Sequence, residues 1–332
     1  MKHIRFYIFA LALFLGVFAR GQQDIQMSQQ LFSRLNNNPA ATGLSNYANA
    51  YLVARQQWAG FEGAPQTIVF NANTYLEQIR AGVGFSALGD KVGNNNLFNV
   101  KAAYAYHVRI GTEHYLSLGI GAGFIHRKFG GTTVNEPEID PDIIQMLMGQ
   151  SRWKADVDLG VTYSTPKLIV GLSATHVSRF LYTNDRNSPF DWFNLPMNAY
   201  GFAEYAFDLN QNVRLTPRAQ VSTVFSTHRN THGNDTLSIM DKIDWFYEFG
   251  ALVEFKNKFW IGATFRNDEA IIAMLGIHLG PNLRIGYAYD YKYFGKTFAN
   301  RRSFGSHEIM VNYRVRIFGN DDNVNFAPRF FD

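Results

Sequence analysis

The chain has 332 residues with 31 basic and 27 acidic side chains, and 15% of its residues are aromatic. It contains no cysteine, which excludes disulfides, thiolate catalysis and the acylated cysteine of a bacterial lipoprotein. No concentrated run of Lys and Arg forms a basic patch, so nucleic-acid binding is not expected.

The first 21 residues are predicted to be a secretory signal peptide. Lys2 and Arg5 precede an apolar run over residues 6–18, and small residues follow at Ala19 and Gly21. The run is too short to cross a hydrocarbon core of about 30 Å as a helix, and no later stretch is long and apolar enough to do so. Removal of Lys2, Arg5 and Arg20 lowers the basic count from 31 to 28 against 27 acids, so the exported chain is nearly neutral.

Residues 22–48 are polar, contain Asn38 followed by Pro39, and lack a clean apolar-polar alternation. We therefore expect no strand here. The segment is interpreted as a periplasmic N-terminal arm or as a plug inside the structure that follows.

Residues 49–318 contain repeated segments in which apolar and polar residues alternate. In the closing segment, for example, Ile309, Val311 and Tyr313 alternate with Glu308 and Asn312, so an extended strand would separate them onto two faces. The clearer segments are 98–110, 115–128, 153–164, 213–225, 244–255, 283–291 and 307–318, and the weaker ones are 50–57, 66–74, 79–88, 168–177, 198–207, 259–266 and 270–278. Their number, about 14, is even, as expected for a closed antiparallel transmembrane β-barrel with lipid outside and a polar interior.

The predicted connections alternate between long and short. Residues 129–152, 178–197, 226–243 and 292–305 form long connections, whereas 111–114, 165–167, 208–212, 256–258 and 280–282 form short ones. Bacterial outer-membrane barrels have short periplasmic turns and longer external loops. We therefore expect a multi-pass barrel in the outer membrane, with residues 319–332 as a periplasmic C-terminal tail.

Four segments carry a resemblance to a known family. They are RQQWAGFEGAPQT at residues 55–67, GDKVG at 89–93, LRIGYAYDY at 283–291 and SHEIMVNYRV at 306–315. In this order and spacing the chain resembles the PorP/SprF family of type IX secretion membrane proteins of Bacteroidetes-type bacteria. It departs from the family at residues 31–33 and 36–38, where more aromatic residues are usual.

The resemblance implies a non-catalytic outer-membrane component of the type IX secretion and gliding-associated machinery. Family members are implicated as a platform that links periplasmic ring and peptidoglycan-associated subunits to the membrane, or as partners of secreted cargo with a C-terminal signal domain. The alternative is a passive channel or a FadL-like transporter for small solutes. A platform predicts a plugged barrel with stable protein partners, whereas a transporter predicts an open lumen or lateral gap and solute flux.

The residues proposed to contact partners lie in three regions. External aromatic loops often supply binding hot spots, which favours the loop around Trp192, although packing within the loop is an equal alternative. The candidates are Gln29, Asn38, Pro39, Arg55 and Trp58 near the N-terminus, Asp191, Trp192 and Phe193 in a long loop, and Phe326, Arg329 and Phe330 in the tail.

No catalytic residue, metal site or cofactor is predicted. Glycines at 119, 121 and 123 would suggest a phosphate-binding loop only between a strand and a helix, and here they alternate within one predicted strand. His228 and His232 are interpreted as solvated loop residues, because the helix and the adjacent Glu of a zinc protease are missing. The acidic residues Glu136, Glu138, Asp140 and Asp142 could bind Ca²⁺, but a solvated acidic loop is favoured.

The remaining polar and aromatic side chains have structural interpretations. Trp153, Trp245 and Trp260 lie at strand ends and are predicted to belong to the aromatic girdles at the membrane interfaces. Charged residues on the polar strand faces are expected to form a network across the lumen. These are Asp156, Asp158, Arg214, Arg218, Glu248, Arg314 and Arg316.

Overall fold

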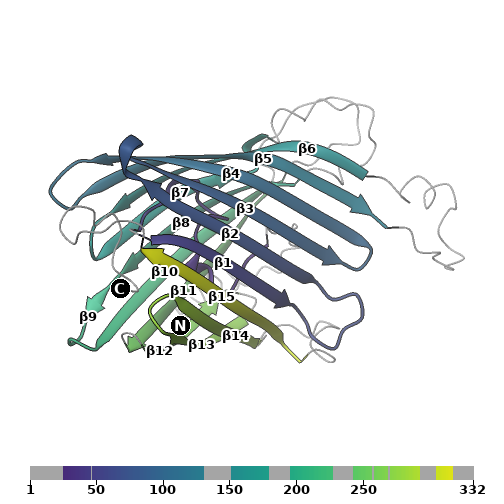
Figure 1. Ribbon diagram of the computed structural model, residues 1–332. Helices are drawn as coiled ribbons and strands as arrows, with labels where there is room; N and C mark the ends of the chain where they lie inside the picture. Colours follow the sequence, from purple (N-terminus) through teal and green to yellow (C-terminus); the bar gives the residue numbers. More distant parts are fainter. Residues whose placement is uncertain are drawn as a thin grey trace, which may run out of the picture.

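The computed structural model describes residues 25–45, 47–130, 151–178, 195–226, 242–255, 258–267, 270–291 and 304–316. Within these ranges the strands form one antiparallel sheet that closes on itself (Figure 1). The strands are β1 (Tyr47–Gln56), β2 (Gln66–Leu76), β3 (Ala81–Val92), β4 (Asn95–Arg109), β5 (Tyr115–Phe129), β6 (Ser151–Ser164), β7 (Leu168–Thr175), β8 (Met197–Tyr205), β9 (Phe207–Asp208), β10 (Val213–Ser226), β11 (Lys242–Phe255), β12 (Phe259–Arg266), β13 (Ala270–Leu279), β14 (Leu283–Tyr291) and β15 (Ser306–Arg316).

Closure comes from β1, which pairs with β2 on one side and with β15 on the other. The two-residue β9 continues β8 along the same edge of β10, so the 15 described strands make a wall of 14. The predicted all-β class and strand number are confirmed. Closure leaves no open edge and satisfies the backbone hydrogen bonds of the wall, which a bilayer cannot do.

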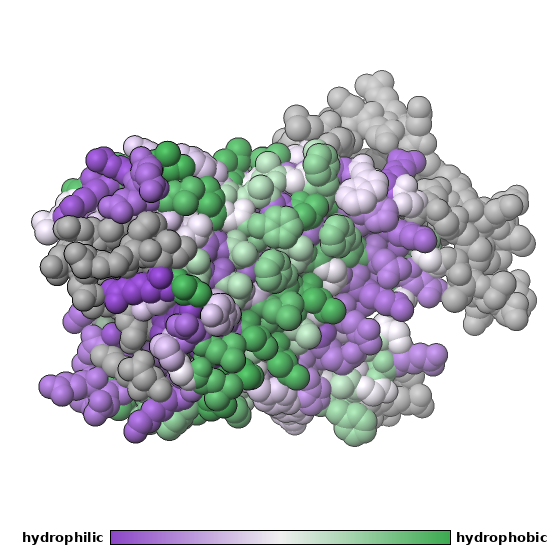
Figure 2. Space-filling view, in the orientation of Figure 1, coloured by the Kyte–Doolittle hydropathy of each residue, from purple (hydrophilic) through white to green (hydrophobic). Residues whose placement is uncertain are grey.

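The two faces of the wall differ as the alternation predicted. On β5, Ile120 and Phe124 point outward and are 46% and 56% exposed, whereas Ser117 points inward and is buried. Figure 2 shows the outward apolar side chains gathered in a band across the middle of the visible face, with hydrophilic residues on either side. Such a band matches the hydrocarbon layer of a membrane.

Three short 3-10 helices accompany the strands: η1 (Gln30–Phe32), η2 (Pro39–Ala41) and η3 (Glu77–Ile79). The second begins where the sequence dictates, because Asn38 caps it by accepting a hydrogen bond from Ala40 N–H at 2.9 Å and Pro39 follows as its first residue. No helix in the described ranges is long and apolar enough to span a membrane.

The connections divide between two ends of the barrel. The loop end carries the connections 57–65, 93–94, 130–150, 176–196, 227–241, 267–269 and 292–305, and the turn end carries 77–80, 110–114, 165–167, 209–212, 256–258 and 280–282. The turns close tightly, as in the bond of 2.8 Å from Thr165 N–H to Leu168 O. The predicted order of long and short connections agrees with this division.

One of the tryptophan predictions is wrong. Trp153 and Trp245 are each 59% exposed on the outer surface, as a girdle requires, but Trp260 is fully buried inside the barrel. Its ring centroid lies 5.1 Å from that of Phe32. The position of Trp260 near a strand end suggested the membrane interface. Its side chain instead points into the barrel, because Trp260 lies on the inward face of β12 together with Arg266.

Candidate functional site

Residues 25–45, here called the arm, run through the lumen of the barrel. Near the loop end, Ser28 contacts Glu308 of β15, and near the turn end the carbonyl of Thr42 bonds His107 of β4. Both wall residues lie on inward strand faces and are buried. The arm is therefore the main described content of the lumen, and its two parts, residues 25–32 and 33–45, are held differently.

Residues 25–32 bind a buried group of charged side chains. Arg55 donates to Asp290 at 2.6 Å and to Glu308 at 3.2 Å, which joins β1, β14 and β15. The two carboxylate oxygens of Glu308 accept the backbone N–H groups of Ser28 at 2.7 Å and Gln29 at 2.8 Å. Charge-assisted bonds of this kind are about twice as strong as neutral ones.

Two further contacts complete this binding. The Ser28 hydroxyl donates to Asp290 at 2.7 Å and accepts from Arg55 at 2.6 Å. Tyr51 donates its hydroxyl hydrogen to the carbonyl of Gln29 at 3.0 Å. The wall therefore recognises mostly backbone groups of the arm.

The charged group continues around the wall. Glu248 accepts from Arg266 at 2.8 Å and from Arg218 at 3.0 Å, and Arg266 lies 3.9 Å from Asp290. We call the whole set the ion-pair chain; its members are Arg55, Glu308, Asp290, Arg266, Glu248 and Arg218. It confirms that Arg218 and Glu248 belong to a network across strands, as the polar faces predicted.

Apolar packing supports the same part of the arm. Met27 and Leu31 are 4% and 2% exposed and pack in a buried cluster with inward residues of five strands. The wall members of the cluster are Tyr51, Val53, Val69, Leu252, Trp260 and Met310. Full burial of one such side chain stabilises by about 1.5–3 kcal/mol relative to exposure.

Residues 33–45 are held by close fit. A Cβ placed on Gly119 would overlap the backbone of Ala40, and one on Gly160 would overlap the side chain of Asn38. Glycine is needed here because the arm backbone approaches the wall directly. The interpretation of Gly119, within the alternating glycines of β5, as a strand residue that relieves crowding is confirmed.

Asn38 fixes this second part to the wall. Its amide group donates to the carbonyls of Val161 on β6 and Leu172 on β7, both at 3.3 Å, while its oxygen caps η2. Arg34 forms an ion pair with Glu204 of β8 at the start of the same part. The arm thus bridges opposite sides of the barrel.

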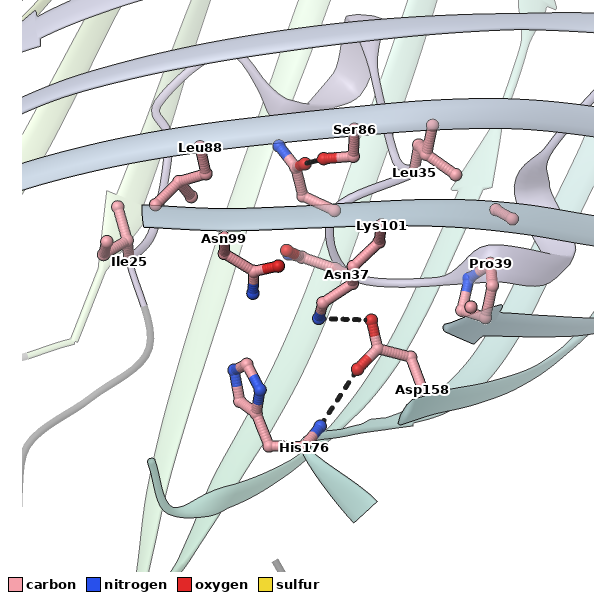
Figure 3. Close-up of a pocket in the computed structure, with 13 residues that line it drawn as sticks. Ile25, Leu35, Asn37, Pro39, Ser86, Leu88, Asn99, Lys101, Asp158 and His176 are labelled. Atoms are coloured by element: carbon pink, nitrogen blue, oxygen red, sulfur yellow. Dashed lines mark hydrogen bonds and ion pairs between the residues drawn. The ribbon is translucent and has the colours of Figure 1, made fainter. Parts of the chain in front are cut away.

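A second charged cluster lies beside Asn37 and Pro39 (Figure 3). Lys101 is 2.6 Å from both Asp156 and Asp158, and His176 donates its backbone N–H to Asp158 at 3.0 Å. The two carboxylates and the His176 ring could in principle ligate a metal ion. The Lys101 ammonium already lies between the carboxylates, so a metal ion would have to displace it.

A cavity of about 40 Å³ lies between the arm and this cluster, lined by Leu35, Asn36, Asn99 and Lys101 among others. This volume holds only a few water molecules, since one needs roughly 10–15 Å³. The cavity has room for water beside the cluster and no room for a larger solute.

The structure places the described candidate residues mainly in the lumen. Gln29, Asn38, Pro39 and Arg55 are buried and contact the chain itself. Trp58 is half-buried in the connection 57–65, with φ of 50° and its N–H bonded to Ser306. Their contact with partners stays a prediction.

Several predictions concern residues outside the described ranges. These are the signal peptide, the C-terminal tail and the loop residues Asp191, Trp192, Phe193, Phe326, Arg329, Phe330, Glu136, Glu138, Asp140, Asp142, His228 and His232. Sequence reasoning also missed partners that the fold supplies, namely Asp290 and Arg266 for the ion-pair chain. Their inward strand faces were a usable signal, but only the strand register brings them together.

Comparison with known proteins places the chain among secretion proteins. A family model described as type IX secretion system membrane protein PorP/SprF matches residues 19–313. No curated protein matches the chain.

Solved structures of outer-membrane proteins also match. The toluene transporter TbuX of Ralstonia pickettii is 14% identical, with 86% of this chain and 93% of that chain covered and a TM-score of 0.49. A FadL homologue of Pseudomonas aeruginosa is 10% identical over 86% and 94% of the two chains, with a TM-score of 0.44. The outer membrane protein Omp33 of Acinetobacter baumannii is 10% identical over 82% and 99%, with a TM-score of 0.42.

Proposed function

The chain belongs to the PorP/SprF family of type IX secretion system membrane proteins, and we propose that it acts there as a non-catalytic platform. Its closed barrel and its family make it an outer-membrane component of that secretion machinery. In the proposed role, the barrel gives periplasmic ring and peptidoglycan-associated subunits, or secreted cargo, a fixed attachment point in the membrane.

The observation that supports a platform is the arm bound across the lumen. It contacts β14, β15 and β1 through Ser28 and β6 and β7 through Asn38. A solute could pass only if these bonds broke, whereas a platform benefits from them because they join opposite sides of the wall. The arm therefore favours the platform over the passive channel or FadL-like transporter.

The buried state of the reactive groups supports a non-catalytic role. His107 lies 2.6 Å from the Ser117 hydroxyl, the distance of a nucleophile and its base. Both residues are nevertheless buried, and the second ring nitrogen of His107 bonds Thr42 of the arm. No substrate can reach this pair while the arm is seated.

The proposed division of surfaces follows the two ends of the barrel. The turn end and residues 319–332 would meet the periplasmic subunits, and the loop end would meet cargo. Short, tightly bonded turns suit a rigid attachment, while long loops suit recognition that varies among proteins.

Crosslinking in outer membranes followed by affinity purification tests this function. The platform predicts recovery of type IX periplasmic subunits or cargo, and negligible solute flux through the purified barrel in lipid bilayers. Deletion of residues 323–332 should lower recovery of periplasmic subunits, while a scrambled tail of equal length controls for chain length. Solute flux together with no recovered secretion subunit would establish the transporter instead.

A further inference from the structure

We propose that the wall around Glu308 is a preformed peptide-binding site, and that residues 25–32 of the arm are its exchangeable ligand. The ligand class is a short peptide that offers two consecutive backbone N–H groups, a hydroxyl group, and two apolar side chains four residues apart. Residues 33–45 stay seated when residues 25–32 leave. This inference goes beyond the platform role and does not depend on it; when residues 25–32 leave, residues 33–45 still lie in the lumen through the bonds of Asn38.

The first argument is what the site recognises. Glu308 accepts the N–H groups of Ser28 and Gln29, and Tyr51 donates to the carbonyl of Gln29. These are backbone groups that any peptide carries. Selectivity comes from the Ser28 hydroxyl and from the apolar positions of Met27 and Leu31. This is the pattern of a peptide receptor, in which main-chain bonds give affinity and side-chain pockets give specificity.

The second argument is that the site keeps its charge balance without its ligand. The ion-pair chain has three arginines and three carboxylates, and each pairs with another member of the wall. Departure of residues 25–32 removes no charge from it, because the segment itself carries none. A buried charge that loses its partner is strongly destabilising, and the balanced chain avoids that cost.

The third argument is that buried polar side chains are hydrogen-bonded less completely in residues 25–32 than in residues 33–45. In residues 25–32, the side-chain oxygen of Gln26, both amide atoms of Gln29 and the nitrogen of Gln30 are buried without a hydrogen-bond partner. In residues 33–45, no buried side-chain atom is in that state. Each such group costs about 1–3 kcal/mol unless water reaches it, so the first part is bound less completely.

The wall that faces this part of the arm, beside the Glu308 site, shows the same deficit. Gln26 contacts Ser222 of β10, and Phe32 contacts Trp260 of β12, so the first part lies over this side of the barrel. Here Gln220 and Trp260 also have buried donors without a partner. Native interiors hold few such groups, so residues 25–32 gain less from hydrogen bonding on this side than a fully paired segment would.

A matched pair of cysteine variants tests the exchange in the full chain, which has no natural cysteine. Leu31 and Leu35 are 2% and 6% exposed, so Leu31→Cys and Leu35→Cys remove similar volumes from the two parts of the arm. We expect a small thiol reagent to label Leu31→Cys about tenfold faster in the folded barrel, a ratio that one lost hydrogen bond can produce. Equal rates would overturn the proposal.

The wall residues supply the second measurement. Glu308→Gln should speed labelling of Leu31→Cys and leave Leu35→Cys unchanged, and Tyr51→Phe should do so more weakly. Glu254→Gln is the matched control, because Glu254 is buried on β11 and pairs with His278. A Leu31→Cys rate that Glu308→Gln does not change would contradict the assigned site.

A fluorescent peptide of residues 25–32 completes the test. It should bind the full-length barrel saturably, with binding weakened about tenfold by Glu308→Gln. Glu308→Gln should therefore weaken peptide binding while it speeds labelling of Leu31→Cys. Glu254→Gln should keep the saturable binding of the natural chain, which would show that loss of a buried carboxylate elsewhere in the wall does not produce the effect. Absence of saturable binding to the natural chain would show that the arm is a permanent part of the core. Recovery of secretion partners is unaffected by either result, so the platform role is judged separately.

Discussion

Residues 25–32 and 33–45 cross the same lumen but depend on different properties of the wall. The first part is held mainly by charged side chains that bind its backbone, and Gly286 makes room only for the end of the Gln29 side chain. The second part is held by glycines that let its backbone approach several strands. A charged side chain such as Glu308 can bind the backbone of a segment at one site, and the segment can leave when those few bonds break. Close fit requires the correct small residue at each point of contact, so we expect the second part to be the fixed one.

The largest expected effect comes from removing the charge that holds the first part. Glu308→Ala leaves Arg55 with one fewer carboxylate and two buried arm N–H groups without their acceptor. Loss of one partner from a buried ion pair costs about 3–5 kcal/mol. Urea unfolding of the barrel in lipid vesicles measures this fall in the free energy of unfolding.

The exposed residue Glu62 provides the control for this experiment. Its replacement by Ala should change the free energy of unfolding by less than about 0.5 kcal/mol. A Glu308→Ala barrel as stable as the Glu62→Ala barrel would mean that the ion-pair chain does not hold the arm.

The close fit of the second part is tested by Gly119→Ala. The added methyl group overlaps the backbone of Ala40, so the arm or β5 must shift, at a cost of about 1–3 kcal/mol. Gly89→Ala on β3 is the matched control, because a Cβ there meets nothing within 4 Å. Both variants go through the same urea titration, and equal stability of the two would disprove the close fit.

Asn38→Ala should have a smaller effect on the same part. It removes the cap of η2 and the amide donors to Val161 and Leu172, and a lost cap costs about 1 kcal/mol. The free energy of unfolding should fall by about 1–2 kcal/mol. Asn96→Ala, at an exposed position of β4, should leave it unchanged.

The smallest effect concerns the independence of the two parts. Glu308 and Gly119 share no contact partner among the described residues, so the effects of Glu308→Gln and Gly119→Ala should add within about 0.5 kcal/mol. A double-mutant cycle measures this coupling. A coupling well above that value would show that the arm behaves as one unit and would remove the distinction drawn here.

The strands of the wall were predictable because the alternation of apolar and polar residues lies within each strand's own sequence. A strand places alternate residues on opposite faces, so residues such as Phe98 and His107 of β4 could be assigned outward and inward from their positions alone. The same rule would have placed Trp260 inward, had its strand face been weighed above its position at a strand end.

The arm and its binding site were not predictable in the same way. Nothing in the alternation of β1, β14 and β15 says that Arg55 meets Asp290, because that contact depends on register and on closure of the sheet. The arm itself lacks a periodic pattern, so its sequence left a periplasmic arm and a plug as alternatives. Residues 25–45 find their place in the lumen only when strands that are distant in the sequence pair and bring their inward residues together around the arm.

The bond between Ser28 and Glu308 joins residues 280 positions apart. Because β15 is the last described strand along the chain, its Glu308 is synthesised after every other described strand, whereas residues 25–32 are synthesised before them all. This bond therefore cannot form until the chain has been made through β15, so residues 25–32 wait for their acceptor while all the other described strands are synthesised.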